Sequence, residues 1–272
     1  QSFHIESFIA QLKKTLSNAS INLRLELLRC VFNYQIRRRT MISNPVTTVG
    51  LLKLDQKPIR IWTLEEACRF VGYAETKYVG TCWESVYVWY LIALNTGMRF
   101  GEILGLKWSA IDFSNRLITV CRTRCRLSRL VRETTKGRRI RHVPINDALH
   151  QPLWNLRQRD RKTEWVLEVN GHLPNHFNLC NRNWLKDIQE SGVSRIRIHD
   201  MRHTFASHFM MHGGELFKLQ AILGHADMRM TMRYAHFSKS FLLENANIVL
   251  IGTEGNVVKV DFQKQQIPTG SL

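Results

Sequence analysis

The longest uninterrupted run of apolar residues, Val86–Leu94, constrains the fold more than any other segment of the chain. Its nine residues are too few to cross a bilayer, which takes about 20, so the sequence predicts no transmembrane segment. Residues 84–95 instead favour a helix that is apolar on most of its faces, and such a helix is buried on all sides. We therefore expect a globular domain built around one central helix that ends near Gly97.

Helical periodicity recurs through most of the remaining chain, with apolar residues three and four positions apart. Thr63 begins a segment with the pattern of a capping box, because Glu66 stands three residues later. Arg116–Arg122 and Ile140–Ile145 instead alternate apolar and polar residues, which is typical of strands. Further helices are expected over 5–14, 18–37, 101–107, 147–160, 176–190, 200–212, 215–223 and 227–233. The fold class expected is mainly α with a small antiparallel β-sheet, an α+β fold.

Asn44 and Pro45 break the helical pattern and indicate a boundary between two domains. We expect a helical first domain over 1–47, a linker over 48–58, a second domain over 59–247 and a tail over 248–272. The tail contains one alternating segment, Val257–Phe262, that predicts a short strand. A lone strand needs the edge of another sheet, which either its own chain or a neighbouring protomer could supply. The first residues show no signal-peptide pattern and lie inside a helical pattern, as in a fragment of a longer protein.

The chain is strongly basic, since 39 Lys and Arg against 22 Asp and Glu give a net charge of +17. Such an excess predicts a polyanionic partner, either nucleic acid or an anionic membrane surface. Membrane binding would require basic residues gathered on one face of an amphipathic helix, whereas here they are spread along the chain. Nucleic acid is therefore the favoured partner.

The six cysteines lack zinc-site spacing and favour free thiols in a reducing cytosol.

Residues 198–237 concentrate side chains that suit a phosphate site. His199 and Arg202 are three apart and share one face at the start of a helix, where the helix terminus favours an anion. His225 follows a glycine just past the expected end of the next helix, and Tyr234 comes nine residues later. Each of these residues alone is more often a solvated charge or a core aromatic than part of a site.

Three further histidines, His203, His208 and His212, raise the alternative of a metal site. His208 and His212 are neighbours on a helix, but no glutamate follows His208 as it does in the H-E-x-x-H motif. We therefore expect no metal.

Two basic residues lie at turns upstream of this segment. Arg99 follows the glycine that ends the central helix, and Lys136 lies in the basic connection between the two expected strands. On its own, Arg99 suggests a surface residue or an ion pair with Glu102. Lys136 on its own suggests a solvated hairpin tip.

The segments TGMRFGEILGL, HDMRHTFASH and LGHADMRMTMRYAH resemble the sequence boxes of the tyrosine recombinases, the family of the phage integrases. Lys136 also precedes Val143 and Pro144 at the interval usual in that family. The resemblance extends over residues 5–240, and HTFASHFMM and MTMRYAHF are particularly similar to temperate-phage integrases. It implies a catalytic domain of the tyrosine-recombinase fold preceded by a partial core-type DNA-binding domain. The active-site residues that it implies are Arg99, Lys136, His199, Arg202, His225 and Tyr234.

The resemblance also implies the reaction. Tyr234 would attack a DNA phosphate and form a 3′-phosphotyrosine link, and nearby cations would favour its phenolate. Arg99 and Arg202 would hold the non-bridging oxygens, and His225 would hydrogen-bond the phosphate. This chemistry needs no metal, nucleotide or other cofactor.

Two further residues would handle protons and orientation. Lys136 would protonate the departing 5′-hydroxyl as general acid, and His199 would assist proton transfer or orient the phosphate. The function implied is a site-specific recombinase that integrates or excises a mobile element such as a prophage. Its partners would be double-stranded DNA attachment sites, three further copies in a homo-tetramer and accessory DNA-bending or directionality factors. It would act in the cytoplasm of a bacterial host, away from membranes.

Several alternatives stay open on the sequence alone. A type IB topoisomerase shares the tyrosine chemistry, and a chromosome-dimer resolving enzyme belongs to the same family. A recombinase that has lost catalysis could serve as a DNA-binding regulator, although every catalytic residue type is present. The charge also permits an RNA-binding protein, but the chain shows no RNP-like aromatic strand and no GXXG loop.

Overall fold

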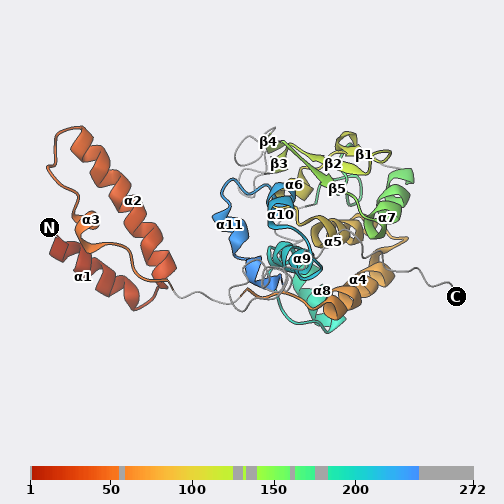
Figure 1. The fold of residues 1–272 in the computed structure, drawn as a ribbon, viewed down its shortest axis with the longest axis horizontal. Coiled ribbons are helices and arrows are strands. Elements are labelled where there is room, and N and C mark those ends of the chain that lie inside the picture. Colours follow the sequence, from red (N-terminus) through yellow and green to blue (C-terminus); the bar gives the residue numbers. More distant parts are fainter. Residues whose placement is uncertain are drawn as a thin grey trace, which may run out of the picture. The chain divides into compact units, whose positions relative to one another are not determined.

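A computed structural model of the chain describes residues 2–54, 59–124, 131–132, 140–159, 163–174 and 183–238. The chain forms two compact units, Gln1–Pro58 and Ile59–Leu272, and each is described by itself (Figure 1). No helix among the described residues is long and apolar enough to cross a membrane.

The first unit consists of three helices, α1 (Ser2–Lys13), α2 (Asn18–Arg37) and α3 (Pro45–Val49). Asn44 begins α3, because its side-chain oxygen accepts a hydrogen bond from the backbone of Val46 at 3.0 Å. The three helices enclose a small apolar core of Ile5, Ile9, Ile21, Leu25 and Val46.

The first residues of the expected linker over 48–58 continue the first unit. Residues 48 and 49 complete α3. Asn22 then holds Leu52 through two hydrogen bonds, one to its carbonyl at 2.8 Å and one from its N–H at 2.9 Å. Asn18 also donates to the carbonyl of Lys53 at 2.9 Å, so residues as far as Lys53 are attached to the first unit. Residues 55–58 lie outside the described residues.

The second unit is built around α5 (Glu84–Thr96), in which every residue from Val86 to Ala93 is buried. This confirms the central helix expected from the apolar run. Figure 1 shows the small sheet at one edge of the unit, α4 and α8 at the opposite edge, and α5 between them. The other helices are α4 (Leu64–Tyr78), α6 (Phe100–Leu104), α7 (Asp147–Gln158), α8 (Trp184–Ser191), α9 (Asp200–Met211), α10 (Leu216–Leu223) and α11 (Arg229–Met232).

Local sequence signals explain several of these boundaries. Thr63 and Glu66 form the expected capping box at the start of α4, with bonds of 3.2 and 3.0 Å. The short helix expected over 101–107 is instead Phe100–Leu104 and ends at Gly105. The later part of that expected range is extended, because Lys107 pairs with Trp165 in an isolated β-bridge.

The expected strands form one antiparallel sheet in the order β1-β2-β5. β2 (Leu117–Val120) pairs with β5 (Arg141–Pro144), and Ile118 lies opposite Val143 with both side chains in the core. β1 (Ile111–Asp112) adds a two-residue edge, and β3 (Thr123–Arg124) pairs with β4 (Val131–Arg132) in a separate ribbon. These short strands escape prediction because two residues cannot show an alternating pattern. The mainly α fold with a small antiparallel sheet is confirmed.

Two predicted features lie outside the described residues: Lys136, between β4 and β5, and the tail 248–272 with its strand Val257–Phe262.

Candidate active site

The turn after α5 positions the first arginine. Gly97 ends α5 in the left-handed region with φ +61°. A β-carbon there would lie 2.5 Å from the ring of Phe205 and 2.8 Å from Leu223, so only glycine allows α9 and α10 to approach this turn. Two residues later, Arg99 begins α6, and its side chain keeps 28% of its surface exposed.

Glu102 is the buried anchor of this region, with a side chain only 2% exposed. Its carboxylate accepts a hydrogen bond at 3.0 Å from the guanidinium of Arg99 and bonds of 3.0 and 2.6 Å from Arg141 on β5. Burial alone would raise the pKa of Glu102, but the bonds and charge of Arg141, followed by Arg99, bring it below the usual range. The group is therefore an anion that holds two guanidinium groups in place.

Arg202 supplies a third guanidinium from the first turn of α9 and is only 4% exposed. It donates to the carbonyl of Gly97 at 2.6 Å and to the carbonyl of Leu223 at 2.7 Å. Burial, followed by the charge of Arg99, lowers its pKa to about 9, which still leaves it cationic at neutral pH. Arg202 thus ties the ends of α5 and α10 together and places a fixed positive charge between them.

His225 lies directly after α10, which Gly224 ends in the left-handed region with φ +66°. Its Nδ1 lies 2.8 Å from the hydroxyl of Thr231 at α11, and Arg99 reaches the carbonyl of Gly224 at 3.5 Å. Burial, together with Arg202 and Arg99, lowers the pKa of His225 to about 4. The imidazole is therefore neutral at physiological pH and can still donate one hydrogen bond to an anion.

Tyr234 is buried at 1% exposure in an apolar cluster with Ala206, Met210, Leu219 and Leu223. Its hydroxyl lies 2.5 Å from Nδ1 of His203 on α9. Burial raises the pKa of Tyr234, while the charges of Arg233 and Arg202 act in the opposite direction. In this structure the phenol is thus protonated and shielded, with a histidine as its hydrogen-bond partner.

His199 comes immediately before α9 and stays exposed as a residue. Its ring still packs against that of His203, with centroids 5.2 Å apart. Partial desolvation of the imidazole beside these neighbours, followed by the charge of Arg202, lowers its pKa. His199 is therefore a neutral, accessible group at the edge of the same cluster.

The structure thus places five of the six predicted site residues in one region. Arg99 and Arg202 both lie at the turn after α5, and His225 lies next to the carbonyls that they contact. Tyr234 and His199 both contact His203. Contacts among α9, α10, α11 and β5 bring these segments together, as Figure 1 shows.

Three residues of this site were not among the predicted ones. The sequence showed Glu102 only as an ion-pair partner of Arg99, and His203 only as a candidate metal ligand, although both stand within the segments that resemble tyrosine recombinases. Arg141 carried no signal beyond its place in a basic strand. In the part of the chain that the structure describes, no group of three or more His, Cys, Asp or Glu residues is placed to hold a metal ion.

Comparison with known proteins agrees with this arrangement. The phage integrase family matches residues 63–240. This chain belongs to that family. The integrase of Escherichia phage 186 is 30% identical over 84% of this chain and 60% of its own length. The tyrosine recombinase XerC of Pediococcus pentosaceus is 25% identical over 85% of this chain and 75% of its own length. The predicted membership of the tyrosine recombinases, with phage integrases among the relatives, is thereby confirmed.

Solved structures support the fold of this family member. An integrase of transposon Tn1549, solved with transposon right-end DNA, has a TM-score of 0.75 at 22% identity and covers 90% of this chain and 85% of its own. The catalytic domain of bacteriophage HP1 integrase has a TM-score of 0.50 at 27% identity, over 70% of this chain and 94% of its own. The chain spans about three-fifths of the length of the phage 186 integrase and of the putative integrase of Pseudomonas phage Pf1, at 60% and 59%.

Proposed function

We propose that this protein is a site-specific DNA recombinase that cleaves and rejoins DNA through a 3′-phosphotyrosine link at Tyr234. One observation carries the proposal. Arg99, Arg202 and His225, from three separate segments, are linked through the carbonyls of Gly97, Leu223 and Gly224. The charge of Arg202 also acts on Tyr234. The family to which the chain belongs includes integrases and tyrosine recombinases.

The arginines suit a phosphodiester because their donors are already fixed by the protein. Cleavage passes through a pentacoordinate phosphate whose charge grows on the non-bridging oxygens, and preorganised donors lower that barrier. Arg99 is the partly exposed member of the pair, and Arg202 adds charge from a buried position. His225, held by Thr231, would donate a further hydrogen bond to the same phosphate.

In the proposed reaction the oxygen of Tyr234 bonds to phosphorus while the bond from phosphorus to the 5′-oxygen breaks. The phenol loses its proton, and the departing 5′-oxygen gains one, for which Lys136 is the proposed donor. His199 would orient the phosphate or assist proton transfer. Since Tyr234 is only 1% exposed, DNA binding must uncover its hydroxyl before attack. A 5′-hydroxyl of a second duplex then reverses the step and exchanges the strands.

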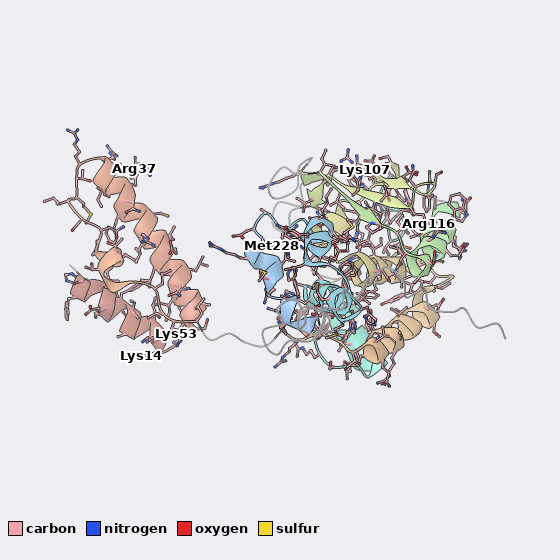
Figure 2. The ribbon with its side chains drawn as sticks, viewed as in Figure 1. Lys14, Arg37, Lys53, Lys107, Arg116 and Met228 are labelled. Atoms are coloured by element: carbon pink, nitrogen blue, oxygen red, sulfur yellow. The ribbon has the colours of Figure 1, made fainter. Side chains whose placement is uncertain are left out.

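The proposed partner is double-stranded DNA at attachment sites, bound by both units. The net charge of +17 supports this, and basic side chains are spread over the molecule (Figure 2). Lys14, Arg37 and Lys53 belong to the first unit, which we propose as part of a core-type DNA-binding domain before the catalytic domain over 59–247. The logarithm of the binding constant should fall by about 0.9 per phosphate contact for each tenfold rise in salt concentration.

The remaining assignments follow from the same proposal. The protein would act as a tetramer on two duplexes, with accessory factors setting direction, in the cytoplasm of a bacterial host that carries the mobile element. The tail 248–272 would add a strand either to its own catalytic domain or to that of a neighbour.

The test uses nicked duplexes tiled across the DNA that flanks the gene, without magnesium or ATP. Wild-type protein should become covalently attached to one of them on a denaturing gel, and Tyr234→Phe should bind the same duplex without attachment. Tyr87→Phe is the matched control, because Tyr87 is a buried tyrosine of α5 outside the site. Loss of the Tyr87 hydroxyl should not prevent formation of the adduct. An adduct that persists in Tyr234→Phe would contradict the proposal.

A further inference from the structure

The hydrogen bond between Tyr234 and His203 has no role in the reaction as proposed so far. The phenol oxygen lies 2.5 Å from Nδ1 of His203, and both residues are buried. A tyrosine attacks phosphorus well only after it loses its proton, and its usual pKa is about 10. The proton therefore needs an acceptor within hydrogen-bond distance of this hydroxyl.

The surroundings of His203 keep its imidazole neutral, so that one ring nitrogen can accept a hydrogen bond. Asp200 faces it from the start of α9, His199 and Arg197 from the segment before α9, and Arg233 from the end of α11. Burial comes first, followed by His199 and Arg233, and together they lower the pKa of His203 to about 4. Asp200 acts in the opposite direction, but its carboxylate is shared with Arg197, which donates to it at 2.8 Å.

We propose that His203 is the general base that takes the proton of Tyr234 at the moment of attack. The inference rests on the proposed function, because it requires Tyr234 to be the nucleophile. The O–H bond of Tyr234 breaks, the proton moves to Nδ1 of His203, and the freed electron pair of the oxygen forms the bond to phosphorus. The bond from phosphorus to the 5′-oxygen breaks, and that oxygen takes its proton from a separate acid.

The same residue serves the reverse step. When a 5′-hydroxyl attacks the phosphotyrosine, the phenol oxygen leaves and recovers its proton from the imidazolium of His203. Each cycle of cleavage and rejoining therefore returns His203 to its neutral form with no net proton. Asp200, next in sequence to His199 and paired with Arg197, is placed to favour the transient imidazolium by its negative charge.

Other titratable groups near Tyr234 are less suited to this role. Arg202 and Arg233 are cations and cannot accept a proton at neutral pH. His225 has its Nδ1 against Thr231, and the described contact of the phenol is with His203. The ring of His199 packs against that of His203, and it is His203 that contacts the phenol.

The test compares wild type, His203→Asn, Tyr234→Phe and a control in single-turnover adduct formation on the duplex that wild type attacks. Asparagine places an amide close to the position of Nδ1, so it can hold the hydroxyl but cannot take its proton. His212→Asn is the matched control, because His212 is an exposed histidine at the end of the same helix. Rates are measured from about pH 6 to pH 9.

His203→Asn should form the adduct about 10²- to 10⁴-fold more slowly at neutral pH. Its rate should rise about tenfold per pH unit, because the phenol must then ionise by itself, whereas the wild-type rate should not show this rise. Rejoining should slow as well, and His212→Asn should match wild type. His203→Ala should recover part of the lost rate when imidazole is added to the solution, which a purely structural effect would not allow.

A His203→Asn rate and pH profile equal to those of wild type would overturn the inference. A faster rate would overturn it too, since His203 would then be a restraint on Tyr234. If His203→Asn proves unfolded by circular dichroism, the imidazole experiment on His203→Ala decides, and absence of recovery refutes the base. Failure of the proposed function is distinguishable, because the adduct would then persist in Tyr234→Phe.

Discussion

Glu102 offers the sharpest test of how the arginine cluster is held. Its carboxylate accepts one hydrogen bond from the guanidinium of Arg99, two from Arg141 and one from the backbone N–H of Arg99 at 2.8 Å. Glu102→Gln keeps the shape of the side chain but removes the charge and turns one acceptor into a donor. That donor would face a guanidinium group that can only donate.

The expected cost follows from the burial of the carboxylate, which is only 2% exposed. Removing one partner of a buried ion pair leaves an uncompensated charge and costs about 3–5 kcal/mol. Arg99, Arg141 and Arg202 also repel one another once the anion is gone. Glu65→Gln is the matched control, because Glu65 pairs with Arg69 on an exposed face of α4, and such a pair is worth about 0.5 kcal/mol or less.

Equilibrium unfolding in urea measures both changes. Because the pKa of Glu102 is lowered in the folded protein, its contribution is complete above the usual glutamate pKa of about 4.3 and is lost as pH falls toward the lower folded value. The difference between wild type and Glu102→Gln should thus be constant from neutral to mildly acidic pH and shrink below that range. A Glu102→Gln loss no larger than that of Glu65→Gln would refute the reasoning.

Three further substitutions probe the same site. Arg202→Lys keeps the charge but replaces the two nitrogens that bond the Gly97 and Leu223 carbonyls with a single ammonium, so the rate of adduct formation should fall about 10²- to 10³-fold while a mobility-shift assay still detects DNA binding. Gly224→Ala should lower the free energy of unfolding in urea by about 1–3 kcal/mol, because its φ is +66° and the new β-carbon would lie 2.8 Å from Arg141 Cδ. Thr231→Val should cost about 1–3 kcal/mol in the same assay by leaving His225 Nδ1 without its partner. A wild-type rate or free energy of unfolding for any of these substitutions would contradict the contact from which its prediction was made.

The elements with strong local signals were predictable from the sequence. The apolar run of α5, the capping box at Thr63 and the alternation in β2 and β5 each depend on residues close in the chain, and the structure follows them. Local signals are weaker where the conformation of a segment depends on a partner far along the chain. Asn22 holds the segment up to Leu52, and Lys107 pairs with Trp165, and neither contact can be recognised from the local pattern.

The same distinction between local and distant signals applies to the candidate site. Residue type and order within the boxes indicated Arg99, Arg202 and Tyr234, and the structure brings their segments together. The contact from His203 to the Tyr234 hydroxyl joins residues 31 positions apart, and the shared carboxylate of Glu102 depends on Arg141, 39 positions later. No periodicity or spacing in one sequence can specify such pairs, because they arise only when the helices and strands pack together.

The most direct test of the central claim is to identify the amino acid that carries the DNA. The covalent complex on the cleaved duplex would be trimmed with nuclease, digested with trypsin and analysed by mass spectrometry. Cleavage after Arg233 gives a peptide that begins at Tyr234 and ends at Lys239. The account predicts a 3′-linked nucleotide on this tyrosine in the wild-type complex. A nucleotide on any other residue, with Tyr234 unmodified, would contradict it.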